Sequence, residues 1–105
     1  MMRLSLGAAL ALAQAACASA PAPVRAPLGA LRIACTPDDA DVYVDDSLAG
    51  SCAHVRDRAM PVPAGVRRVE IRRPGFFTRY VEIDVAANRA SAAELRIDLR
   101  ESPEA

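Results

Sequence analysis

Five short segments in which apolar and polar residues alternate constrain the fold of this chain more than any other feature of its sequence. They are residues 31–35, 41–45, 69–72, 81–85 and 95–99. A period of two places alternate side chains on opposite faces of a strand, so each segment predicts a β-strand with one buried face. Turn-forming residues separate the segments at intervals of about 10 residues. The pattern predicts an all-β fold, a small antiparallel β-sandwich.

The length of 105 residues allows one small domain with a thin core. We expect a signal peptide at residues 1–16, a tether at 17–27, the folded domain at 28–101 and a disordered tail at 102–105. The chain carries 13 basic and 13 acidic side chains, so it lacks the excess of positive charge that proteins use to bind a polyanion. Nucleic acid is therefore not an expected partner.

The first 16 residues have the three-part pattern of an export signal. Arg3 supplies the positive charge, residues 4–13 are apolar, and small residues follow. A helix of ten residues is about 15 Å long, half of a hydrocarbon core of roughly 30 Å, so we do not expect a transmembrane anchor. The predicted localisation is the cell envelope.

Residues 15–17, Ala-Ala-Cys, resemble the end of a bacterial lipobox, in which small residues precede a cysteine that receives a diacylglyceryl group. Gln14 departs from that motif, which usually has an aliphatic residue there. We expect lipidation of Cys17, so that an extended Ala- and Pro-rich tether holds the domain near a membrane. Ordinary signal-peptidase sites at 13–15 and 18–20 are the alternative, and they imply a soluble product.

Four motifs follow one another between residues 31 and 99, and they begin with Pro-Asp-Asp-Ala at 37–40. The others are Val-Tyr-Val-Asp-Asp at 42–46 with Gly50 after it, the segment 63–71, and Pro-Gly-Phe at 74–76. Their order resembles the PEGA domain, a small all-β envelope module named after a Pro-Glu-Gly-Ala turn. The resemblance implies a compact sandwich related to prealbumin-type or carboxypeptidase regulatory folds, without catalytic residues.

Three positions depart from the PEGA pattern. Asp39 and Asp46 stand where glycine is usual, and Cys52 stands where proline is usual. Aspartate tolerates left-handed backbone angles better than most residues, so the two turns can still form.

Cys35 and Cys52 are the two thiols that remain if Cys17 takes lipid, the right number for one disulfide in an oxidising compartment. The chain leads away from Cys35 along 41–45 and returns from Leu48 over a similar length, so both cysteines should reach the same end of the sheet. We expect a disulfide between Cys35 and Cys52. The alternative is a buried Cys35 with Cys52 free on a loop.

Catalytic and metal-binding patterns are weak. His54 is the only histidine, and no nucleophile stands in a catalytic context around it. Cys52 and His54 lack the further ligands of a zinc site. The aspartates within 38–46 offer carboxylates for calcium, but the strand pattern at 42–44 interrupts them, and turn chemistry explains the same residues. We expect no enzyme activity, metal or cofactor.

Arginines are concentrated in the middle of the chain, at positions 56, 58, 67, 68, 72, 73 and 79. A solvated face is the plain interpretation. The alternative is a surface for an anionic envelope ligand, such as a glycan or a lipid head group, with Arg72 and Arg79 as candidate contacts. The aromatic residues Tyr43, Phe76, Phe77 and Tyr80 are interpreted first as core or rim residues, and a sugar-stacking platform is the alternative.

These features predict a non-catalytic binding or structural module that is exported to the cell envelope. The expected partners are a membrane, through the lipid, and an envelope glycan or another envelope protein, bound through loops and an exposed strand face. A soluble secreted or periplasmic effector, such as a small enzyme inhibitor, is the alternative.

Overall fold

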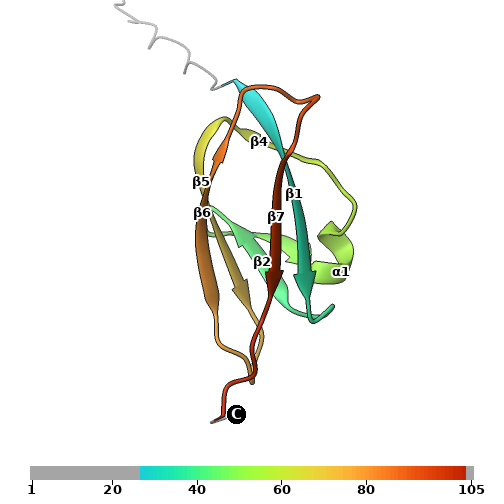
Figure 1. The fold of residues 1–105 in the computed structure, drawn as a ribbon, viewed down its shortest axis with the longest axis vertical. Coiled ribbons are helices and arrows are strands. Elements are labelled where there is room, and N and C mark those ends of the chain that lie inside the picture. Colours follow the sequence, from blue (N-terminus) through green and yellow to red (C-terminus); the bar gives the residue numbers. More distant parts are fainter. Residues whose placement is uncertain (1–26, 104–105) are drawn as a thin grey trace, which may run out of the picture.

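The computed structural model describes residues 27–103, which form two β-sheets packed face to face (Figure 1). One sheet has three strands in the order β4-β1-β7, and the other has four in the order β3-β2-β5-β6. The strands are β1 (Leu28–Thr36), β2 (Asp41–Val44), β3 (Ser47–Ser51), β4 (Met60–Pro63), β5 (Gly65–Arg72), β6 (Arg79–Val85) and β7 (Ala93–Asp98). One helical turn, α1 (Cys52–Val55), follows β3. The predicted all-β sandwich is confirmed.

Each of the five alternating segments forms a strand, namely β1, β2, β5, β6 and β7 in chain order. Burial follows the predicted period of two, as β5 shows clearly. Val69 and Ile71 are fully buried, whereas Arg68 and Arg72 are exposed. The alternation therefore determines which side chains of each strand meet the core.

The pairing of the strands is antiparallel with one exception. β1 and β7 run parallel, from Leu31 beside Ala93 to Thr36 beside Asp98. These are the first and last strands of the domain, so no hairpin connects them and nothing local requires an antiparallel pair. The three-stranded sheet is mixed, a detail that alternation alone does not specify.

Two strands, β3 and β4, form without an alternating pattern. β4 contains Pro61 and Pro63, which cannot donate to a neighbouring strand. It nevertheless pairs with β1, because it lies at the edge of its sheet, where proline is tolerated. Met60 and Val62 carry the N–H groups that can face β1, opposite Leu31 and Gly29.

The core lies between the two sheets and is built from aliphatic side chains. The largest fully buried residues are Leu31, Ile33, Val42, Cys52, Val55, Val69, Ile71 and Val85. No aromatic ring belongs to this group, and Tyr80 and Phe77 are each 54% exposed. Of the aromatic side chains, only Phe76 packs against this core, and it is partly buried.

Backbone hydrogen bonding continues past β7. Glu101 pairs with Phe76, and the Ser102 amide donates to the Gly75 carbonyl, one residue beyond the predicted end of the domain. The predicted signal peptide, Cys17, all of the predicted tether except Pro27, and residues 104–105 lie outside the described residues. Within residues 27–103, no helix is long and apolar enough to cross a membrane.

The turn between β2 and β3 uses two aspartates in the left-handed region, with φ of 48° at Asp45 and 69° at Asp46. Asp45 is held in place on both sides, because its Oδ1 accepts the Arg68 amide at 3.0 Å and its Oδ2 pairs with Arg67 at 3.0 Å. Asp39, the other position where the PEGA pattern has glycine, is not among the positive-φ residues of the described chain. Only Asp46 therefore carries the backbone strain expected at both positions.

Replacing Asp46 with glycine should raise the free energy of unfolding by roughly 0.5–1 kcal/mol, because glycine adopts a positive φ without steric cost. Urea denaturation of the purified protein measures this change. Asp39→Gly is the matched control, and it should not stabilise, since it relieves no left-handed backbone and removes an ion pair with Arg73. Equal or lower stability of Asp46→Gly would contradict the argument.

Candidate functional site

The predicted disulfide is present and joins the end of β1 to the start of α1. The Cys35 and Cys52 sulfurs are 2.05 Å apart, and the Cα atoms are 5.3 Å apart. Both residues are buried, at 3% and 0% exposure. Ser51 caps the helical turn, since its Oγ accepts the His54 amide at 3.1 Å. The bridge therefore belongs to the core and does not present a reactive thiol.

His54 is exposed and lies against the backbone of Gly50. A Cβ built at Gly50 would come within 2.5 Å of the His54 Cδ2, so the glycine makes room for the imidazole. Within residues 27–103, no three His, Cys, Asp or Glu side chains gather closely enough to hold a metal ion. The His54 ring therefore packs against Gly50 of β3.

Three of the five aspartates within 38–46 pair with separate arginines. Asp38 pairs with Arg56, and Asp39 accepts two hydrogen bonds from Arg73, at 2.7 and 2.8 Å. These hydrogen bonds lower the pKa of Asp39, partly opposed by its desolvation. Asp45, in the β2–β3 turn, accepts hydrogen bonds from the Arg67 side chain and the Arg68 amide. Because these carboxylates point to different partners, they do not converge on one cation.

The outer face of the four-stranded sheet carries an exposed row of large side chains. Strand register places Leu48 of β3, Tyr43 of β2, Glu70 of β5 and Tyr80 of β6 side by side across the sheet. Leu48 is 61% exposed and Tyr80 is 54% exposed. We call this surface the tyrosine face, and define it by Tyr43, Leu48, Val66, Glu70, Arg72 and Tyr80.

Arg72 is the last residue of β5, and its side chain contacts two other residues of the tyrosine face. Its Nε donates to the Glu70 Oε1 at 2.6 Å, and its Nη2 donates to the Glu70 Oε2 at 2.8 Å. The guanidinium carbon is 4.5 Å from the centre of the Tyr43 ring, a cation–π contact. The hydrogen bonds to Glu70 raise the pKa of Arg72, whereas desolvation lowers it. The charge interactions with Tyr43 and Tyr80 also raise this pKa. This guanidinium is therefore already paired within the protein.

The pKa of Glu70 should lie below its ordinary value of 4.5, because the hydrogen bonds from Arg72 lower this pKa more than desolvation raises it. A carboxylate with a depressed pKa stabilises the fold above its unfolded pKa, and this contribution disappears as the pH falls through the folded pKa. We expect Arg72→Ala to return the Glu70 pKa to the ordinary range. Carbon-detected NMR of the Glu70 carboxyl against pH measures it.

The control for this titration is Arg68→Ala, which removes a guanidinium from the same strand face without touching the Glu70 hydrogen bonds. The pKa of Glu70 should keep its depressed value in that variant. A native Glu70 pKa at 4.5 or above, or one unchanged by Arg72→Ala, would show that the ion pair does not form in solution.

Arg72 and Arg79, the two candidate contacts from the sequence, do not share a face. Arg79 pairs in register with the inward-facing Ile71, whereas Arg72 belongs to the outward-facing set of β5. Arg73 reaches Asp39 and lies 5.4 Å from the centre of the Phe76 ring. The arginines of the middle segment are thus divided among separate sites.

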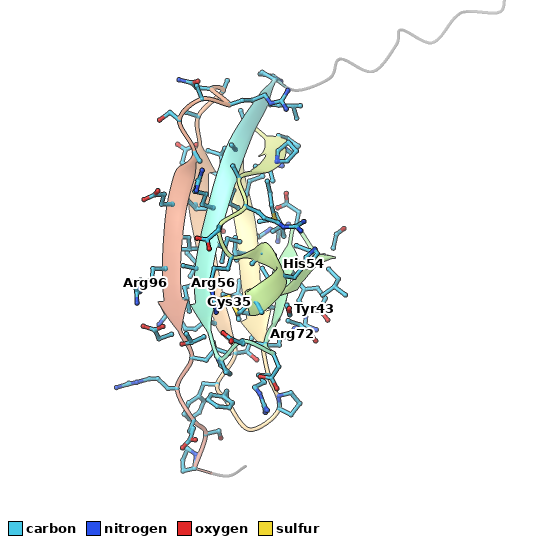
Figure 2. The ribbon with its side chains drawn as sticks, turned by 90° about the vertical axis from the view of Figure 1, so that its right-hand side faces the viewer. Cys35, Tyr43, His54, Arg56, Arg72 and Arg96 are labelled. Atoms are coloured by element: carbon cyan, nitrogen blue, oxygen red, sulfur yellow. A yellow bond between two sulfur atoms is a disulfide. The ribbon has the colours of Figure 1, made fainter. Side chains whose placement is uncertain are left out.

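The opposite side of the sandwich has two adjoining hollows of about 470 and 420 Å³. They share Ala34, Asp57 and Arg96 in their linings. Figure 2 shows Arg96 on the side of the molecule away from Tyr43 and Arg72. Each hollow is lined by two arginines and two acidic residues, so neither has a clear charge preference.

Sequence reasoning placed Tyr43 and Tyr80 at the core or rim and did not identify the tyrosine face. The signal was available in the parity of the two strands. Tyr43 alternates with the inward-facing Val42 and Val44, and Tyr80 alternates with Val81 and Ile83. The register that aligns the two rings with Glu70 comes only from the tertiary structure.

No family model matches this chain, and no curated protein matches it either.

Proposed function

We propose that this protein is an exported, non-catalytic, PEGA-like binding module of the cell envelope, which is anchored through lipid on Cys17 and binds its partner with the tyrosine face. The all-β sandwich agrees with the architecture of such modules. The Ala-Ala-Cys motif behind an export signal supports the anchor.

The observation that carries the binding role is the position of the exposed apolar side chains. Leu48, Val66 and Tyr80, at 61%, 54% and 54% exposure, all lie on the outer face of one sheet. An antiparallel sheet with one solvated face normally presents polar residues there. These exposed side chains contribute nothing to the core. Apolar surface that is concentrated on one face in this way is typical of interaction sites.

Fractionation of cells tests the anchor. The native protein should sediment with membranes, and Cys17→Ser should appear in the soluble fraction, because a chain without lipid has no comparable membrane affinity. If both proteins distribute identically, the anchor is refuted. A soluble native protein would instead favour the secreted effector.

Retention on isolated envelopes tests the binding face with the soluble Cys17→Ser protein. Adding Tyr80→Ala should reduce retention, whereas adding Phe77→Ala should not, although both rings are 54% exposed. Phe77 is a matched control, because it lies in the loop between β5 and β6, where its amide bonds to the Arg100 carbonyl. Absent retention, or equal loss in both variants, would overturn the proposed function.

A further inference from the structure

We infer that the partner of the tyrosine face is a basic protein segment, one of whose arginine or lysine side chains stacks on Tyr80 beside Glu82 and Asp84. This inference rests on the proposed binding function and adds the chemistry of the partner to it.

The arrangement around Tyr43 shows what a cation does on this face. Arg72 of the chain itself stacks on the Tyr43 ring and is held there by the Glu70 carboxylate. Tyr80 lies on the other side of Glu70 in register. Its ring is 54% exposed, and no cation stacks on it within the described residues. Tyr80 therefore presents an aromatic surface that a cation from outside can reach.

Carboxylates accompany Tyr80 on the same face of β6. Glu82 and Asp84 alternate with the inward-facing Val81, Ile83 and Val85, and both are exposed. Neither carboxylate makes a hydrogen bond or ion pair with a residue that the structure describes. An aromatic ring with carboxylates beside it is the same combination that binds Arg72 next to Tyr43, except that here the cation is external.

The overall charge of this face favours a cationic partner. Its outward carboxylates are Asp41, Glu70, Glu82 and Asp84, and its outward guanidinium groups are Arg68 and Arg72. Arg72 neutralises Glu70, so three carboxylates remain with Arg68. Arg68 is the register neighbour of Glu82 but forms no ion pair with it. An anionic glycan or lipid head group would meet net repulsion here.

The area of the face favours a segment rather than a folded partner. β5 has 8 residues and is about 27 Å long, and four strands span about 14 Å between the outer axes. The product is about 400 Å², half of the roughly 800 Å² that each partner buries in a standard stable interface. A second copy of the chain would therefore bind weakly through this face, whereas an extended segment can bind within an area of this size. The aliphatic side chains of Leu48 and Val66 suit the aliphatic parts of such a segment.

Three labelled 12-residue peptides test the inference in fluorescence anisotropy with the purified protein at low salt. They repeat Arg-Ala-Ser, Gln-Ala-Ser or Glu-Ala-Ser, so they differ only in the first residue of each repeat, which is cationic, neutral or anionic. The arginine peptide should bind, the other two should not, and 0.5 M sodium chloride should weaken binding. Equal binding of the glutamine or glutamate peptide would overturn the inference.

Matched variants locate the binding. Tyr80→Ala should weaken the arginine peptide about two- to fivefold, the range of an exposed cation–π contact, and Phe77→Ala should leave it unchanged. Glu82→Gln combined with Asp84→Asn should weaken it roughly twofold or more. Glu94→Gln combined with Asp98→Asn removes the same charge from the outer face of the three-stranded sheet and should have no effect. Binding unchanged in Tyr80→Ala would overturn the inference.

A neutral hexasaccharide of N-acetylglucosamine separates this inference from the proposed function. No binding of the sugar is expected. Tyr80-dependent binding of the sugar without binding of the arginine peptide would assign the face to glycans, which refutes the basic segment and leaves the binding module intact. If Tyr80→Ala does not reduce retention on envelopes, the binding module itself is refuted, whatever the peptides show.

Discussion

Replacing Cys35 and Cys52 together with alanine will lower the free energy of unfolding by about 3 kcal/mol. The bridge closes a loop with a sequence separation of 17, and in the chain-entropy model a closed loop of this length restricts the unfolded chain by about that amount. Small domains have a total stability of roughly 5–15 kcal/mol, so this single bond supplies a large share. Urea denaturation of the two proteins measures the difference.

Thiol counting provides the control for this result. The protein unfolded without reductant should show Cys35 and Cys52 unreactive, and the same protein unfolded with reductant should show both. In the folded state a reductant should act slowly, because the two residues are only 3% and 0% exposed. Two reactive thiols without reductant, or an alanine variant as stable as the native protein, would refute the bridge.

Replacing Gly29 with alanine will lower the free energy of unfolding by about 1–3 kcal/mol, the usual cost of overpacking. A Cβ at this position would stand 2.1 Å from the Ala86 carbonyl oxygen and 2.5 Å from the Val85 Cγ1. The first of these atoms belongs to the backbone at the end of β6, so the two sheets would have to move apart to admit the methyl group. Thermal or urea unfolding detects a loss of this size.

Ala34→Ser is the matched control for Gly29→Ala. It adds one heavy atom to the same strand, but on the exposed outer face, so the free energy of unfolding should change by no more than about 0.5 kcal/mol. If Gly29→Ala is as stable as Ala34→Ser, the sheets do not approach each other as closely as the structure shows.

Local patterns were sufficient for much of the fold. Alternation at 31–35 and 69–72 predicts both the strands and their buried faces, because the side-chain period of a strand depends only on the backbone of that strand. The pairing of Cys35 with Cys52 also followed from the sequence, since chain lengths on either side of a turn restrict where the two thiols meet. β4 could not be predicted, because its two prolines are acceptable only at a sheet edge.

Only the tertiary structure decided which residues meet across strands. Alternation within β5 is sufficient to put Arg72 and Glu70 on one face, but the alignment of Tyr43, Glu70 and Tyr80 in one row depends on the register of three strands. Likewise, Arg79 is separated from Arg72 because it pairs with the inward-facing Ile71. The physical reason is that the face of a side chain is a property of one strand, whereas register is set jointly by turns and by packing between segments far apart in the chain.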